Sequence, residues 1–183
     1  MKFEITLIAL LFSVTAFAGG YYNPSIDVYD PVTGLYYKSI RSNESHGFLG
    51  SKDKSLVNVY IYDPVSDTGK FLFPQSKNVQ ILSLAYETSV EDGKVSFYAT
   101  NYSSFIKNNQ NIEPREPKSR MLILTRNTET DEKTIYFAKK DGSDLQKLRT
   151  LSQSEEWHIG VKNSVIRIVK QVGLKLKLES INW

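Results

Sequence analysis

Residues 174–179 read Leu-Lys-Leu-Lys-Leu-Glu, and this stretch decides the fold class. Apolar and charged residues alternate with a period of two, which places the leucines on one face of a β-strand and the charges on the other. We therefore expect a half-buried strand. The preceding segment 165–169 is rich in β-branched residues, and Gly173 lies between the two segments. Residues 164–181 are thus predicted to form a β-hairpin.

Upstream, one supersecondary unit occurs twice. Tyr29-Asp30-Pro31-Val32-Thr33-Gly34 is echoed 33 residues later by the segment 62–69, Tyr-Asp-Pro-Val-Ser-Asp-Thr-Gly. Asp-Pro followed by Gly is turn chemistry, so the two turns are predicted to occupy equivalent positions in neighbouring hairpins. Similar turn signals recur at 91–94, 129–133 and 141–142. Together they predict an all-β antiparallel meander of about ten to twelve strands.

Three segments depart from this strand pattern. Leu145, Leu148 and Leu151 are three apart within 144–153, which allows a short helix, and a weaker helical pattern covers 79–86. Residues 108–118 contain Pro114 and Pro117 among polar residues and are predicted to form a loop. None of these segments is long enough to change the fold class.

Residues 135–148 read Ile-Tyr-Phe-Ala-Lys-Lys-Asp-Gly-Ser-Asp-Leu-Gln-Lys-Leu, and Trp157 opens the next strand. Over residues 135–160 the chain resembles a blade segment of TolB-like (WD40-like) β-propellers, in which a strand meets a D-G-S turn and an outer strand ending in Leu. The chain has Gly-Val-Lys-Asn at 160–163 where that pattern shows S-P-D-G. A closed propeller needs at least four four-stranded blades of about 40–45 residues. The resemblance therefore implies a partial or atypical propeller, and a β-sandwich is the alternative.

The N-terminal residues predict export. Lys2 and Glu4 precede an apolar run from Ile5 to Val14, and Ala16-Phe17-Ala18 provides a cleavage site for signal peptidase before Gly19. The run is too short to cross about 30 Å of hydrocarbon. We expect residues 1–18 to be a signal peptide, residues 19–183 to form a single β-rich domain, and the protein to be periplasmic or secreted. The chain has no cysteine, which excludes disulfides and thiol chemistry.

Groups that carry catalysis are sparse in this composition. The two histidines are His46, in a polar segment, and His158, which follows Glu155, Glu156 and Trp157. Neither has the spacing of a metal site, and the carboxylate pairs fall in predicted turns. We therefore expect a protein that is not an enzyme and has no cofactor. A small envelope hydrolase using the His158 region, and a small outer-membrane β-barrel ending in Trp183, are the alternatives.

A binding role requires only a rigid frame and a few anchoring side chains. The predicted anchors are aromatic or basic: Tyr60, Tyr62, Trp157, Lys175 and Lys177. The formal charge of +3 is concentrated toward the C-terminal end, where residues 113–183 contain fourteen Lys/Arg against ten Asp/Glu. We expect a non-catalytic protein-binding module, for example an inhibitor or immunity-type protein of the bacterial envelope. Its partner is expected to be another envelope or secreted protein rather than nucleic acid, and the mature chain is expected to have no transmembrane helix.

Overall fold

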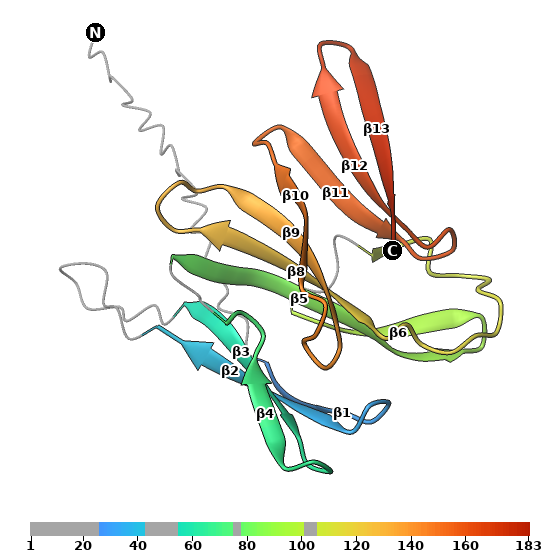
Figure 1. Ribbon diagram of the computed structural model, residues 1–183. Helices are drawn as coiled ribbons and strands as arrows, with labels where there is room; N and C mark the ends of the chain where they lie inside the picture. The colour runs from blue at the N-terminus through green and yellow to red at the C-terminus, as the bar shows by residue number, and fades with distance from the viewer. Residues whose placement is uncertain (1–25, 43–54, 75–77, 101–105) are drawn as a thin grey trace, which may run out of the picture.

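The structure is a computed structural model that describes residues 26–42, 55–74, 78–100 and 106–183. These residues form thirteen β-strands and no helix (Figure 1). The predicted all-β class is therefore confirmed, with one more strand than the upper expectation. The predicted signal peptide 1–18 and the cleavage site before Gly19 lie outside the described residues.

The strands form three sheets. The first contains β1 (Asp27–Asp30), β2 (Leu35–Arg41), β3 (Leu56–Asp63) and β4 (Thr68–Phe71) in sequence order. The second has the order β10-β9-β8-β5-β6, with β5 (Val79–Glu91), β6 (Lys94–Ala99), β8 (Arg120–Asn127), β9 (Lys133–Lys139) and β10 (Gln146–Leu151). The third has the order β13-β12-β11-β7, with β7 (Ile106–Lys107), β11 (Glu155–Gly160), β12 (Val165–Val172) and β13 (Lys175–Asn182). Only the pair β7–β11 is parallel among these described strands.

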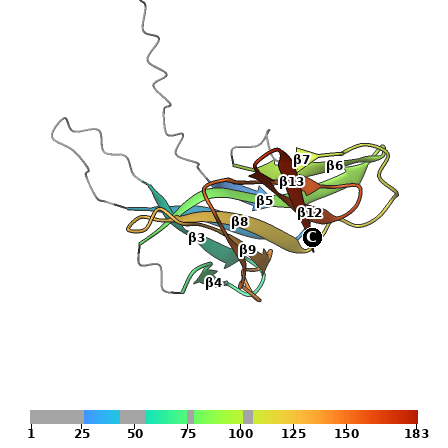
Figure 2. The same ribbon diagram turned by 90° about the horizontal axis from the view of Figure 1, so that it is seen from above.

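The second sheet lies between the other two and is covered on both faces. One cluster of buried side chains joins the first sheet to the second and includes Tyr37, Val59, Ile61, Tyr86 and Met121. The other joins the second sheet to the third and includes Leu122, Ile135, Ile159, Ile166 and Trp183. The strands β5, β8 and β9 consequently have buried residues on both faces. The first and third sheets form the two ends of this stack (Figure 1). In Figure 2, β8 of the second sheet crosses the middle of the view, with β3 and β4 to its left and β12 and β13 to its right.

The repeated Tyr-Asp-Pro turns lie in two neighbouring hairpins of one sheet, as predicted, and they have the same internal hydrogen bonds. Asp30 accepts from the Val32 amide at 3.2 Å and from the Thr33 hydroxyl at 2.8 Å. In the β3–β4 turn, Asp63 accepts from the Val65 amide at 2.9 Å and from the Ser66 hydroxyl at 2.8 Å. The aspartate therefore closes each turn through the residues two and three positions ahead.

The residues that are structurally equivalent in the two turns differ at one position from those that the sequence repeat aligns. The left-handed position of the first turn is Gly34, with φ 76°, and that of the second is Asp67, with φ 51°. The sequence repeat aligns Gly34 with Gly69, which instead lies within β4. A third turn of this kind joins β8 to β9, where the Asn127 side chain accepts from the Glu129 amide and Asp131 has φ 58°.

Both predicted helices are wrong. Residues 79–86 belong to β5, and β10 occupies most of 144–153. A register shift between Lys147 and Arg149 of β10 interrupts its pairing with β9, so a spacing of three between leucines is compatible with a strand.

The predicted hairpin at 164–181 is confirmed as β12–β13, and 108–118 is confirmed as a segment without strand or helix. Among the described residues, no helix is long and apolar enough to cross a membrane.

Candidate functional site

The outer face of the first sheet carries a group of aromatic side chains, which we call the aromatic face: Tyr29, Tyr36, Tyr60, Tyr62 and Phe71. The strand register aligns Tyr29, Tyr36 and Tyr62 in one row across β1, β2 and β3. A neighbouring row aligns Tyr60 with Phe71. Tyr29, Tyr36 and Phe71 are each 48% exposed, and Tyr60 and Tyr62 are half-buried. The predicted anchors Tyr60 and Tyr62 are therefore part of a larger aromatic surface.

The rings of the aromatic face support one another. The ring centroids of Tyr29 and Tyr36 are 4.8 Å apart, and those of Tyr60 and Phe71 are 5.3 Å apart in an edge arrangement. The Tyr62 hydroxyl donates to the Asp67 carboxylate at 2.7 Å, which raises the pKa of Tyr62 above its ordinary value. Cross-strand aromatic contacts of this kind stabilise a sheet and limit ring motion. The face is thus an ordered aromatic surface, bordered by the Lys38–Asp27 ion pair in the row of Tyr60 and Phe71.

Gly69 makes room for one of these rings. An ideal Cβ placed on Gly69 would lie within 3 Å of the Tyr60 ring carbons. Tyr60 therefore lies over the glycine backbone, and an aromatic ring over a cross-strand glycine is a known stabilising arrangement.

We expect Gly69→Ala to displace the Tyr60 ring and to lower the free energy of unfolding by about 1 kcal/mol. The ring current of Tyr60 should shift the Gly69 Hα resonances upfield in the wild-type protein, and this shift should be lost in Tyr60→Leu. Nuclear magnetic resonance and urea denaturation measure the two effects. Unshifted Gly69 Hα resonances in the wild-type protein would contradict this placement of the ring.

The other predicted anchors lie elsewhere. Trp157 is on β11 in the third sheet, half-buried, and packs against the cluster between the second and third sheets. Lys175 and Lys177 are exposed on β13 at the far edge of the third sheet. The structure therefore does not bring the five predicted residues together. The two tyrosines share the outer face of the first sheet, and the two lysines share one face of β13.

The β12–β13 hairpin corrects the expectation of a half-buried terminal strand. Leu174, Leu176 and Leu178 are 104%, 65% and 63% exposed. The register places Lys177 and Glu179 opposite Lys170 and Ile168 of β12, and Ile168 is buried against the second sheet. The charged residues thus share the inner face, and the leucines point outward. The alternation correctly predicts a strand, but the expected assignment of its leucine face to the core is wrong.

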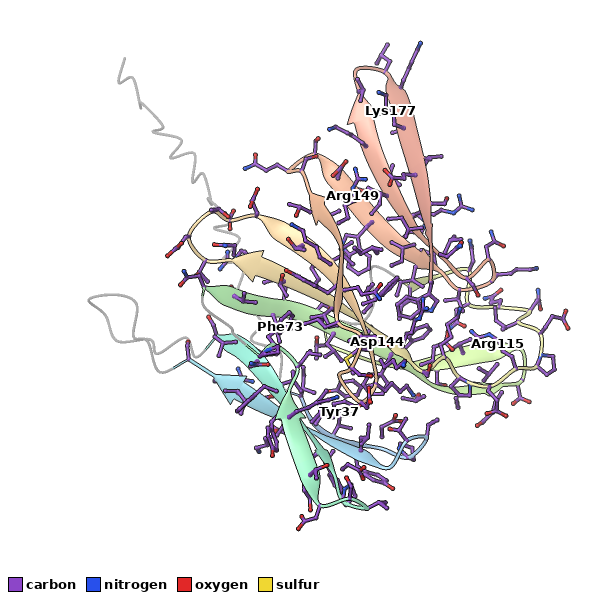
Figure 3. All side chains as sticks on the ribbon, viewed as in Figure 1. Tyr37, Phe73, Arg115, Asp144, Arg149 and Lys177 are labelled. Carbon is purple, nitrogen blue, oxygen red and sulfur yellow. The ribbon has the colours of Figure 1, made fainter. Side chains whose placement is uncertain are left out.

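One of the charged residues on the inner face, Glu179, belongs to an ion-pair network. Arg149 of β10 contacts Glu179 at 2.6 Å and Glu155 at 2.8 Å, so it links the second sheet to the third (Figure 3). Hydrogen bonding to Glu155 raises the pKa of Arg149, and a hydrogen bond from the Ser152 amide lowers the pKa of Glu155. The open groove around this network has a volume of about 420 Å³. Arg149 already bonds both carboxylates, so the groove is best explained as a junction between sheets.

The structure separates His158 from one of the two glutamates that precede it. Glu155 belongs to the Arg149 network on the inner face, whereas the alternation along β11 places Glu156 and His158 on the outer face. Burial, together with Arg167 and Lys107, lowers the pKa of His158. Within the described part of the chain, no group of three or more His, Cys, Asp or Glu could hold a metal ion. His46 lies outside the described residues.

Sequence reasoning missed Tyr29, Tyr36 and Phe71. The repeat contained a usable signal, because Tyr29 precedes Asp30 as Tyr62 precedes Asp63. Two tyrosines at equivalent repeat positions in neighbouring hairpins occupy the same face of a shared sheet. Comparison of the chain with family models, curated proteins and solved structures found no match.

Proposed function

We propose that this chain is an exported, non-catalytic protein-binding module that contacts its partner through the aromatic face. The observation that carries the proposal is the set of five aromatic side chains on one outer sheet face, three of them about half exposed. Tyr and Phe are enriched at protein interfaces because they provide large contact area at low conformational cost. The signal-like sequence of residues 1–18 supports export, which makes an envelope or secreted protein the expected partner.

The proposal includes a finer description of the fold. Three sheets packed face to face, with consecutive hairpins and a D-G-S turn between β9 and β10, support a partial propeller-like arrangement of residues 19–183. Such a stack is open, because each of its terminal sheets has one outer face without a neighbouring sheet among the described strands. A partner that covers the aromatic face would add a layer to the stack. An inhibitor or immunity-type protein acts in this way, by burying a rigid face against its target.

The test begins with affinity capture from envelope extract, identification of the captured protein and its purification. Calorimetry then measures its affinity for the wild-type chain and for variants. Tyr36→Ala and Phe71→Ala are each expected to weaken the affinity about thirtyfold, which corresponds to about 2 kcal/mol for a central aromatic anchor. Leu178→Ser is the matched control, because it removes a similarly exposed apolar side chain from the opposite end of the stack.

Affinity that is unchanged in both aromatic variants would contradict the proposal. So would a partner that is lost only with Leu178→Ser, because that result would place the interface on the third sheet. Turnover of the captured protein by the wild-type chain would replace the non-catalytic role with an enzymatic one.

A further inference from the structure

The β12–β13 hairpin extends beyond the strands β10 and β11 (Figure 1). Residues 171–178 are exposed without exception, on both faces of the ribbon. Lys177 lies near the free end of this hairpin (Figure 3). The two strands are joined by a tight turn at Gly173, which has φ 61°, so the projecting end is a short, regular ribbon. It is the most exposed apolar part of the described chain.

The chemistry of the hairpin end combines apolar and basic residues. Leu174 is fully exposed at the turn, and Val172, Leu176 and Leu178 are exposed beside it. Residues 170–178 contain three lysines and no Asp or Glu. Glu179 and Glu155, at the base of the hairpin, are paired with Arg149. Arg149 balances one of the two carboxylates, so the three lysines still leave this end of the molecule with an excess of positive charge around an apolar tip.

The strand leucines and the lysines lie on opposite faces, although Val172 shares the lysine face. Leu176 and Leu178 share the outer face with Val169, while Lys170 and Lys177 are cross-strand neighbours on the inner face. A lysine has a long apolar stem, so its ammonium group can extend to a polar layer while neighbouring leucines enter an apolar one. This combination is typical of segments that bind at the boundary between lipid headgroups and acyl chains.

We propose that the β12–β13 hairpin binds the surface of an anionic lipid bilayer, with Leu174 and Leu176 entering the interface and Lys170, Lys175 and Lys177 contacting headgroup phosphates. The charge distribution favours this occupant. Three lysines on each hairpin end repel the same end of a second copy, whereas they attract an anionic surface. The proposal is independent of the aromatic face, which lies on the outer side of the first sheet, so each can fail alone.

A second hairpin end of the same chain provides the matched control. The Val65 side chain at the β3–β4 turn is 92% exposed, which lies between the exposed fractions of Leu176 and Leu174. Its neighbours Asp63 and Asp67 are acidic. An exposed apolar side chain alone would thus give both ends the same affinity for lipid, whereas the proposal assigns binding to the basic end only.

The test is co-sedimentation of the full chain with large vesicles of phosphatidylcholine, with and without phosphatidylglycerol. Binding is expected only with phosphatidylglycerol and should weaken as salt rises, because salt screens the lysine–headgroup attraction. Leu174→Ser combined with Leu176→Ser should lower the partition coefficient by at least about tenfold. Lys175→Gln and Lys177→Gln should each lower it about fivefold, and Val65→Ser should leave it unchanged. Circular dichroism confirms that each variant is folded.

Insertion is measured separately with Leu174→Trp, whose fluorescence should shift to the blue and be quenched by brominated lipids. Absence of binding to phosphatidylglycerol vesicles would overturn the proposal, as would equal binding by the wild-type protein and the leucine variant. Sedimentation equilibrium tests whether a second copy of the chain, rather than lipid, binds the hairpin. A wild-type dimer that Leu174→Ser dissociates would assign the hairpin to a second copy of the chain and overturn binding to lipid.

Discussion

Lys140→Met is expected to lower the free energy of unfolding by about 3–5 kcal/mol. The Lys140 ammonium lies 3.1 Å from Asp30 Oδ2, and the two side chains are 2% and 0% exposed. Removing the lysine leaves the aspartate buried without its counter-charge. The cost of that uncompensated charge exceeds the net stabilisation that the intact pair provides.

The position of the pair adds to this effect. Asp30 also closes the first Tyr-Asp-Pro turn, and Lys140 lies over the Tyr86 ring at 5.1 Å. The Tyr37 hydroxyl donates to the Lys140 carbonyl oxygen at 3.0 Å. The pair therefore holds the β1–β2 turn of the first sheet against the second sheet. Loss of the pair should weaken the junction that supports the aromatic face.

Lys139→Met is the control for the neighbouring position. Lys139 pairs with Asp144 at 2.7 Å, but both side chains are more than half exposed. Exposed pairs contribute little, so urea denaturation should show little change for this variant. The double variant Asp30→Asn with Lys140→Met should recover part of the loss, because no buried charge remains. Equal stability of Lys139→Met and Lys140→Met would show that the Asp30–Lys140 pair is not buried in solution.

The sequence predicted the features that depend on neighbours along the chain. The Asp30 and Asp63 turns and the hairpin at 164–181 follow from residues within a few positions of one another, and all three were predicted correctly. The helix expected at 144–153 failed because pairing of β10 with β9, including its register shift, overrides a local spacing of leucines. The prediction that the leucine face of β13 meets the core was wrong for a related reason. Pairing with β12, whose Ile166 and Ile168 are buried against the second sheet, sets which side of β13 faces inward.

Buried charge was the least predictable feature. Lys140 stands beside Lys139 in the same Lys-Lys-Asp-Gly stretch, yet one side chain is buried and the other exposed. Glu87 is fully buried within β5, and nothing in its neighbours along the chain indicates this. Lys140 and Glu87 are each paired with a residue distant in sequence. The aromatic face was partly predictable, since Tyr60 and Tyr62 alternate with buried residues, but its extent depends on strand register.

Arg115→Met is expected to destabilise the protein by about 3 kcal/mol at pH 7, through Glu87. The two guanidinium nitrogens of Arg115 contact both oxygens of Glu87, at 2.6 and 2.7 Å. The Lys118 amide donates to the same carboxylate at 2.8 Å, and the Trp183 indole lies 3.4 Å from it. Glu87 therefore fixes the 108–118 segment and Trp183 to the second sheet. Removing the guanidinium leaves a buried carboxylate with weaker partners.

The pH dependence distinguishes this cause from a loss of packing. Burial alone would raise the pKa of Glu87, but Arg115 and the two N–H donors outweigh it, so the pKa lies below its ordinary value of 4.5. The wild-type carboxylate therefore contributes stability that is present above pH 4.5 and is lost as the pH falls through the lowered pKa. In Arg115→Met, burial is no longer opposed by the guanidinium, and the pKa of Glu87 should rise above its ordinary value. Its carboxyl group then takes up a proton as the pH falls from 7, and the penalty disappears.

The difference in unfolding free energy between the wild-type protein and Arg115→Met should accordingly be largest near pH 7 and shrink toward about pH 4. Urea denaturation across this range measures it. Arg120→Met removes the same charge from an exposed neighbour that lies 5.9 Å from the Phe137 ring, and its smaller effect should not depend on pH. Glu87→Gln combined with Arg115→Met removes the titrating group as well as its partner, so its stability relative to Glu87→Gln alone should not depend on pH either. A difference for Arg115→Met that stays constant from pH 7 to pH 4 would show that the arginine acts through packing of its side chain rather than through the charge of Glu87.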